Sequence, residues 1–183
     1  MKHRKANNLT MAKYIRQRIP KGARTALDVG CGTKPVRYDA QGNPRTMVGH
    51  DLLEVLCSVI EKVYAFDIWP DCIEERKRTG PEARYWVEDA RSWKPCRSYD
   101  VVLCHHVLEH LESQEAEDLL RKLREATSRL LVVGGPLGFV DNTSAMIERR
   151  NPFEEHRSAI DLNLMEDFEI IKIPPAFVAF WSI

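Results

Sequence analysis

The sequence lacks long apolar runs and paired cysteine motifs. No stretch of about 18 apolar residues occurs, although 44% of the 183 residues are hydrophobic, so we predict no transmembrane helix and no membrane partner. The basic N-terminus is not followed by an apolar segment, which argues against a signal peptide. The five cysteines are odd in number, widely spaced and without a C-x-x-C pair, so we expect reduced thiols in a cytoplasmic protein.

Acidic residues are absent from residues 1–24. This stretch holds eight lysines and arginines, whereas the whole chain has 27 basic and 27 acidic residues and a net charge of zero. We therefore separate a basic N-terminal segment (1–24, with a short helix over 9–19) from a single globular domain over 25–183. The segment is either a solvated arm or a means of attracting an anionic ligand. No basic patch interleaved with aromatic residues follows, so a nucleic-acid partner is neither required nor excluded.

Internal repeats and low-complexity tracts are also missing, and the chain alternates between two periodicities. Short β-type runs recur at 25–29, 63–67, 84–87, 99–104, 129–133, 168–173 and 176–181. Helical patterns lie between most of them, with Asp71 and Ser113 as expected N-caps and a further short helix near 159–166. Residues 33–50 are polar and turn-rich, which predicts a long loop.

This alternation predicts the α/β class. We expect a single Rossmann-like, doubly wound, mostly parallel seven-stranded sheet with helices on both faces. The last two β-type runs are so close in the sequence that one of them is expected to run antiparallel at the sheet edge.

A two-glycine turn follows the first predicted strand, in Thr25-Ala26-Leu27-Asp28-Val29-Gly30-Cys31-Gly32. Glycines allow a tight turn and let a ligand approach the backbone N–H groups. Asp28, two residues before the first glycine, suits a ligand that carries a cationic amine and offers nothing to a pyrophosphate.

Polar side chains stand at or just past the ends of four predicted strands: Asp28, Asp67, Asp89 and His105. Ligands of doubly wound sheets bind at the carboxyl ends of the strands, near the point where the strand order reverses. We therefore expect these four residues to share one rim and to form a site.

Four sequence blocks, in this order, carry a family resemblance. They are Leu27-Asp28-Val29-Gly30-Cys31-Gly32, Phe66-Asp67-Ile68, Glu88-Asp89-Ala90 and the run from Tyr99 to Leu111 that contains His106-Val107-Leu108-Glu109-His110-Leu111. Over roughly residues 23–170 the chain resembles a class I S-adenosylmethionine-dependent methyltransferase, of the type 11-like branch with the H-V-L-E-H-L signature. The resemblance implies S-adenosyl-L-methionine as cofactor and S-adenosyl-L-homocysteine as product.

The resemblance also assigns roles in cofactor binding. It implies that Asp28 lies near the ammonium group of the methionine part, Asp67 accepts from the ribose hydroxyls, and Asp89 accepts from the adenine amino group. The complete set that it implies is Asp28, Gly30, Cys31, Gly32, Asp67, Ile68, Trp69, Asp89, Ala90 and His105.

The chain departs from the family pattern in three ways. Lys34 replaces the usual third glycine, the loop over 33–50 is long, and no inserted cap domain is present. The long loop also makes Asp51 a rival ribose ligand, because it follows Gly30 at the spacing of a dinucleotide-binding fold. We prefer Asp67, since no helix fits between Gly32 and a strand ending at Asp51.

The histidines allow several interpretations. A general base matters only if the methyl acceptor must lose a proton, and His105 and His106 are then the candidate catalytic residues. Alternatively, both line or support the pocket. His106, Glu109, His110 and the distant His156 would form a metal site in a third interpretation, but we predict no metal, because a shell with three histidines does not suit Mg²⁺ or Mn²⁺.

The sequence thus predicts a methyltransferase with an unidentified acceptor, more readily a small molecule, including an anionic one, than a macromolecule. One alternative is a catalytically inactive module that binds S-adenosylmethionine or S-adenosylhomocysteine, which Lys34 and the missing cap domain would favour. A second is a nicotinamide-dependent oxidoreductase, against which Asp28 and the missing third glycine argue.

Overall fold

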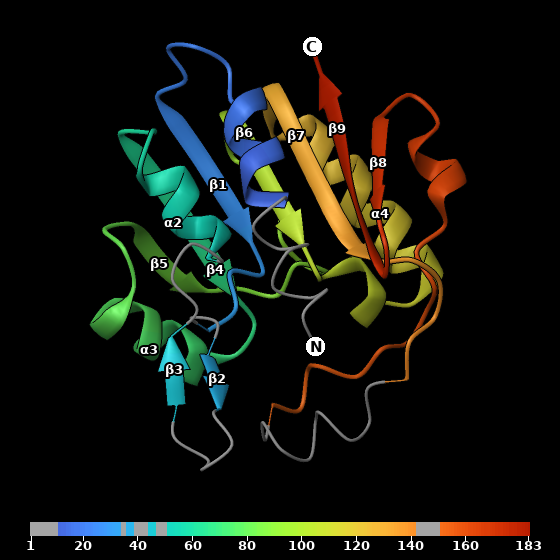
Figure 1. The fold of residues 1–183 in the computed structure, drawn as a ribbon, viewed down its shortest axis with the longest axis horizontal. Coiled ribbons are helices and arrows are strands. Elements are labelled where there is room, and N and C mark those ends of the chain that lie inside the picture. Colours follow the sequence, from blue (N-terminus) through green and yellow to red (C-terminus); the bar gives the residue numbers. More distant parts are fainter. Residues whose placement is uncertain (1–10, 34–35, 39–43, 47–50, 142–150) are drawn as a thin grey trace.

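The computed structural model describes residues 11–33, 36–38, 44–46, 51–141 and 151–183. Its centre is a seven-stranded sheet with the strand order β5-β4-β1-β6-β7-β9-β8 (Figure 1). The strands are β1 (Thr25–Val29), β4 (Lys62–Asp67), β5 (Arg84–Val87), β6 (Tyr99–His105), β7 (Thr127–Pro136), β8 (Glu169–Ile173) and β9 (Ala176–Ser182). The predicted α/β class and the mostly parallel seven-stranded sheet are confirmed.

The strand order reverses at β1, which pairs in parallel with β4 on one side and β6 on the other. β9 is the antiparallel strand, and it pairs with both β7 and β8. The sequence predicts this strand at the sheet edge, but β9 is second from the edge and β8 forms the edge. Only residues 174 and 175 connect these two strands, so they form a hairpin whose second strand pairs with β7.

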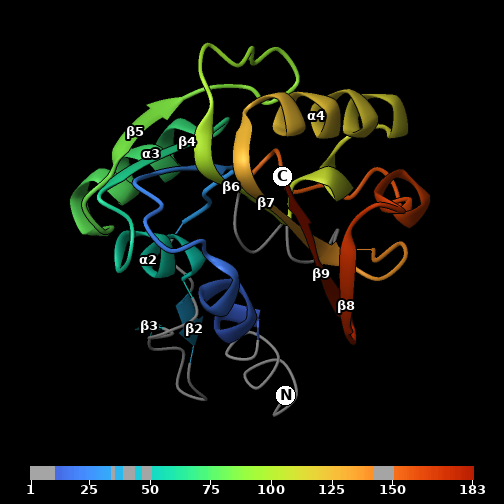
Figure 2. The ribbon, with the colours of Figure 1, turned by 90° about the horizontal axis from the view of Figure 1, so that it is seen from above.

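Helical elements cover both faces of the sheet. They are α2 (Leu52–Cys57), α3 (Pro70–Thr79), α4 (Ser113–Glu125), the 3-10 turns η1 (Leu108–His110) and η2 (Leu162–Met165), and a helix over 11–18. The apolar side of α4 packs on one face, together with the side chains of Phe66 and Leu131. Residues of the helix over 11–18, of α2 and of α3 pack on the other face, so α4 and α2 lie on opposite sides of the sheet (Figure 2).

Two helices begin differently from the prediction. The N-cap of α3 is Trp69 instead of Asp71, since Pro70 suits the first helical turn, where its missing N–H is not needed. Glu112, not Ser113, is the N-cap of α4, and it forms a reciprocal capping box with Glu115.

Two further segments contain different structure than expected. Within residues 33–50, predicted as loop, β2 (Val36–Tyr38) and β3 (Pro44–Thr46) form a small antiparallel pair. Lys34 lies outside the described residues. The helix predicted over 159–166 is the single 3-10 turn η2, whose N-cap Asp161 accepts from the N–H of Asn163.

The described part of the basic N-terminal segment is folded onto the sheet. Met11 and Ile15 are buried in the apolar cluster that also holds residues of α2, β6 and β7. Arg18 pairs with Glu169 of β8, and its guanidinium lies 4.5 Å from the centroid of the Phe180 ring. Residues 1–10, which hold Lys2, Arg4 and Lys5, lie outside the described residues. Among those described, no helix has both the length and the apolar character needed to cross a lipid bilayer.

Candidate active site

The predicted strand-end residues converge at one edge of the sheet. Asp28 is near the end of β1, Asp67 ends the neighbouring β4, and His105 ends β6 on the other side of β1. Asp89 follows β5, which is the next strand beyond β4. The carboxyl ends of β1, β6 and β7 point to the lower edge of the sheet in Figure 1. The structure therefore brings all four side chains to the rim where such sheets bind ligands.

The glycine turn depends on its two glycines for different reasons. Both have left-handed backbone, with φ of 70° at Gly30 and 55° at Gly32. A Cβ at Gly30 would collide with the side chain of Val107, so this glycine is needed for packing against the residue that precedes η1. At Gly32 no heavy atom of the described residues lies within 4 Å of a Cβ position, so the space over this glycine is open to a ligand.

Asp67 is held at the turn by backbone donors. The N–H of Gly32 donates to its Oδ2 at 2.9 Å, and the N–H of Trp69 donates to its Oδ1 at 3.0 Å. Burial raises the pKa of Asp67 above its usual value, although both N–H donors and Arg76 act in the opposite direction. The carboxylate is thus fixed beside the open space over Gly32, with lone pairs left for a ligand's hydroxyl groups.

Asp28 is a buried carboxyl group below the turn, with 5% of its surface exposed. Burial raises its pKa to about 7; Arg76 lowers it, and Asp51 and Asp67 add to the increase. A cationic group placed here would favour the ionised form of Asp28. This environment suits the predicted amine-binding role.

Sequence reasoning did not identify Arg76, which ties α3 to the glycine turn. Its guanidinium donates to the carbonyl oxygens of Cys31, Gly32 and Thr33 and forms a buried ion pair with Asp51. Burial opposes the charge of Arg76, but the hydrogen bond and the charge of Asp51 outweigh it and raise the pKa of Arg76. The sequence offers no signal for this role, because Arg76 lies in the basic run Arg76-Lys77-Arg78 at a helix end.

Asp51, the rival ribose ligand, is engaged elsewhere. It is the N-cap of α2, where its Oδ1 accepts from the N–H of Leu53, and it pairs with Arg76. Asp51 is 2% exposed and, through Arg76, helps to hold the glycine turn in place.

Cys31 contributes to the turn through its backbone. Its N–H donates to the carbonyl of Phe66 at 3.0 Å, and its carbonyl accepts from Arg76. Its thiol hydrogen-bonds with that of Cys72, and this contact, together with burial, raises the pKa of the Cys31 thiol.

The predicted adenine-binding residues are less enclosed. Ile68, Trp69 and Ala90 are half-buried, and Trp69 begins α3 beside Asp67. Asp89 forms a bidentate ion pair with Arg91, which lowers its pKa. An adenine amino group would have to share this carboxylate with Arg91.

The two neighbouring histidines have different environments. The Nε2 of His105 is buried without a hydrogen-bond partner among the described residues, and burial, helped by His106, holds the pKa of His105 well below its usual value. His106 is exposed, has left-handed backbone with φ of 58°, and its Nδ1 lies 2.7 Å from Oε1 of Glu109. Their rings meet edge to face, with centroids 4.3 Å apart.

A second group of polar side chains surrounds Glu109 of η1. Glu109 is fully buried; burial opposes its ionisation, but the hydrogen bond from His106 and the nearby imidazoles of His106 and His110 outweigh it and lower the pKa of Glu109. His110 and the distant His156 stack edge to face at 4.9 Å between centroids. The structure thus brings His156 to η1, as the metal interpretation of the sequence requires.

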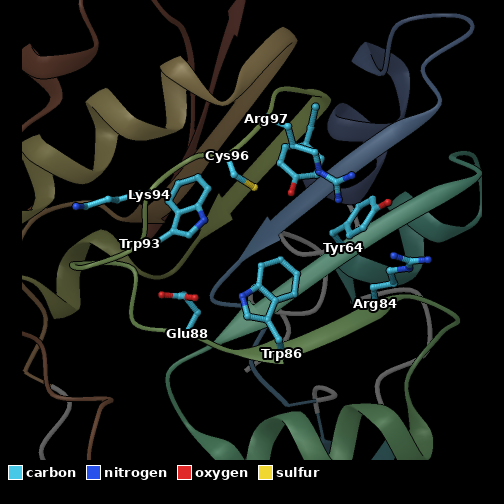
Figure 3. Close-up of a pocket in the computed structure, with 9 residues that line it drawn as sticks. Tyr64, Arg84, Trp86, Glu88, Trp93, Lys94, Cys96 and Arg97 are labelled. Carbon is cyan, nitrogen blue, oxygen red and sulfur yellow. The ribbon is translucent and has the colours of Figure 1, made fainter.

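A separate pocket lies along β4 and β5, away from this group (Figure 3). Its lining includes Tyr64, Trp86, Trp93 and Tyr99, and the guanidinium of Arg97 lies 4.0 Å from the Tyr64 ring centroid. Tyr99 is the first residue of β6, at the opposite end of that strand from His105. We therefore do not include this pocket in the candidate site.

Comparison with known protein families finds a match over part of the chain. Residues 47–130 match the family model described as a methyltransferase domain. No curated protein matches the chain. The H-V-L-E-H-L branch stays a prediction.

Solved structures, several of them of methyltransferases, have folds similar to that of this chain. The DhpI–SAM–HEP complex has 16% identity and a TM-score of 0.63, with 93% of this chain and 84% of that chain covered. N-methyltransferase NodS from Bradyrhizobium japonicum WM9 has 13% identity and a TM-score of 0.62, with 95% and 93% covered. Magnesium protoporphyrin IX methyltransferase from Synechocystis PCC 6803 with bound SAH has 15% identity and a TM-score of 0.59, with 96% and 83% covered. At such identities the likeness concerns the fold. The likeness therefore shows a fold shared with these methyltransferases, and within this fold residues 47–130 match a methyltransferase domain.

Proposed function

We propose that the chain is an enzyme that transfers a methyl group from S-adenosylmethionine to a nucleophilic acceptor and releases S-adenosylhomocysteine. The observation that carries this proposal is the Asp67 carboxylate, fixed by the Gly32 N–H beside open space at the carboxyl edge of the sheet. The names of similar structures add support, since two of them include SAM or SAH.

The residues present fit this cofactor. Asp67 has free lone pairs for both ribose hydroxyls, and Asp28 offers a buried carboxyl group to the ammonium group. Ile68 and Trp69 would border the adenine, and the N–H of Ala90 would reach a ring nitrogen. Bound S-adenosylmethionine supplies a sulfonium methyl group for in-line displacement, in which the acceptor's lone pair forms the new bond and the sulfur–methyl bond breaks.

The two histidines would act on the acceptor side. His105 stays neutral because of its burial, so it adds no positive charge to a pocket that must receive a sulfonium. The Glu109 carboxylate accepts a hydrogen bond from the Nδ1–H of His106. The lone pair of this exposed imidazole is therefore on Nε2. His106 is therefore placed to take a proton from an acceptor that must lose one.

The acceptor is more readily a small molecule than a macromolecule. Similar structures include a magnesium protoporphyrin IX methyltransferase and an amino pentose methyltransferase. The basic residues of the N-terminal segment would favour an anionic acceptor. A nucleic acid stays an alternative outcome of the acceptor test.

Release of S-adenosylhomocysteine in the presence of pooled acceptors tests the proposal. Wild-type protein should release it with an acceptor-dependent rate, and Asp67→Ala should not. Tight cofactor binding without turnover on any pool would favour the inactive binding module. Binding of a nicotinamide cofactor in place of S-adenosylmethionine would favour the oxidoreductase.

A further inference from the structure

We propose that Glu109, His110 and His156 form a binding site for one divalent transition-metal ion. Each offers a ligand atom, and these atoms all lie within 4.8 Å of one another. Two of the residues come from η1 and the third from the segment after residue 151. The N–H groups of Arg157 and Ser158 donate to the carbonyl of Glu109, which holds the two parts of the site together.

Both histidines are oriented as metal ligands usually are. Nδ1 of His110 lies 3.1 Å from the carbonyl oxygen of Glu155, and Nδ1 of His156 lies 2.6 Å from that of Val140. A carbonyl oxygen only accepts, so each Nδ1 carries a proton and the lone pair of the neutral ring is on Nε2. Backbone carbonyls commonly fix the tautomer and orientation of ligating histidines in this way.

Glu109 supplies an independent observation. Its side chain is fully buried, its Oε1 accepts from His106, and its Oε2 has no hydrogen-bond partner among the described residues. A buried carboxylate oxygen without a partner is unfavourable and calls for an explanation. A cation shared with the two histidines would satisfy this oxygen.

The donor set selects the kind of ion. The sequence-based prediction of no metal rests on a mismatch between Mg²⁺ and a shell with three histidines. In the structure His106 contacts Glu109, which leaves two imidazoles and one carboxylate as ligands. This set suits Zn²⁺, Co²⁺ or Fe²⁺ better than Mg²⁺.

To bind an ion, the three ligand atoms have to move slightly closer to one another. Bond lengths of about 2.0–2.1 Å place the ligand atoms of a tetrahedral site about 3.3 Å apart. Three protein ligands leave one position for water or for an oxygen or nitrogen atom of a small molecule. Metal binding itself does not rest on the proposed methyl transfer.

Metal titration of the full chain tests this site. Protein stripped with a chelator should bind one Zn²⁺ per chain in calorimetry, and Co²⁺ should give a visible spectrum that Zn²⁺ abolishes. His110→Ala and His156→Ala should each weaken binding at least tenfold. Asp118→Asn, which neutralises an exposed carboxylate of α4 outside the cluster, should leave it unchanged.

Several results would overturn the proposal. These are no binding of either ion at equimolar concentration, an unchanged affinity in His156→Ala, or displacement of Co²⁺ by a modest excess of Mg²⁺. If His110→Ala fails to fold, His156→Ala carries the test, because His156 lies in the partly exposed segment after residue 151. A Zn²⁺-dependent increase in Tm that His156→Ala abolishes would support the site, and no increase in wild type would count against it.

Discussion

Asp28 is buried, so its proposed role in binding an ammonium group depends on its protonation state. Its pKa of about 7 reflects burial first, with Arg76 favouring the charge and Asp51 and Asp67 opposing it. In the unfolded chain the same group ionises near 3.8. Folding therefore becomes less favourable as the pH rises from about 4 to about 7, because ionisation is then easier in the unfolded state.

Asp28→Asn should consequently stabilise the ligand-free protein at neutral pH. The amide resembles the protonated acid, so the gain in unfolding free energy should be small near pH 4, grow with pH, and level off above about 7. The pKa difference corresponds to roughly 4 kcal/mol at most. Urea unfolding of both proteins at several pH values measures the gain. A difference that does not vary with pH would contradict the shifted pKa.

The same residue should make cofactor binding depend on pH. An ammonium group binds the ionised carboxylate, so the affinity of wild type for S-adenosylmethionine should increase towards pH 7 and then level off. Asp28→Asn should bind more weakly above pH 7 and lose this dependence below it. Calorimetry at several pH values gives both curves, and parallel curves would remove Asp28 from the ammonium role.

Asp67 should contribute most to ribose binding. Asp67→Asn should weaken S-adenosylmethionine binding by about 1.5–3 kcal/mol, the range for hydrogen bonds to charged groups. Asp71→Asn is the matched control, since Asp71 is exposed on the first turn of α3. Asp51 is not a neutral control, because it pairs with Arg76. Equal affinities of the Asp67 and Asp71 variants in calorimetry would exclude the ribose role.

At the level of elements, α3 supports the glycine turn through one side chain. Arg76 reaches from α3 to the carbonyls of Cys31, Gly32 and Thr33, and Asp51 at the start of α2 neutralises it. Three segments that are distant in the sequence thus share one buried charge pair. The position of the turn depends on this pair.

Arg76→Met should therefore destabilise the protein by about 3–5 kcal/mol, because it leaves the Asp51 charge buried and unpaired. Asp51→Asn should also destabilise, whereas the double variant should lose less than the sum of the two. Urea unfolding provides these values, and calorimetry should show weakened cofactor binding in Arg76→Met. Strict additivity of the two changes would mean that the pair is not coupled.

The strands were predictable because their signal is local. Buried runs such as 25–29 and 99–104 alternate with helical patterns, and the sheet follows from that alternation. The features that the sequence did not predict depend on tertiary contacts. Nothing near Arg76 in the sequence distinguishes it from Lys77, yet only Arg76 is buried. Nor does the sequence show that η1, which carries Glu109 and His110, is a single 3-10 turn joined by backbone hydrogen bonds to a distant segment.

At the scale of the whole molecule, the predicted site residues lie where the strand order of the sheet reverses. β1 lies between β4 and β6, so Asp67, the glycine turn and the histidines come from adjacent strands. α4 covers one face of these strands and α2 and α3 cover the other, which leaves the carboxyl edge for ligands. A ligand at this edge contacts several elements at once and should stabilise the entire fold.

S-adenosylhomocysteine should accordingly raise the melting temperature, and a nicotinamide dinucleotide should not. A ligand at one hundred times its Kd adds about 2.7 kcal/mol to the unfolding free energy, which for a chain of this size corresponds to about 5–10 °C. Differential scanning fluorimetry with each ligand measures the shift, and Asp67→Asn should reduce it for S-adenosylhomocysteine. A larger shift with NADH would overturn the proposed cofactor, because the Asp28 carboxylate, which suits an ammonium group, offers nothing to a pyrophosphate.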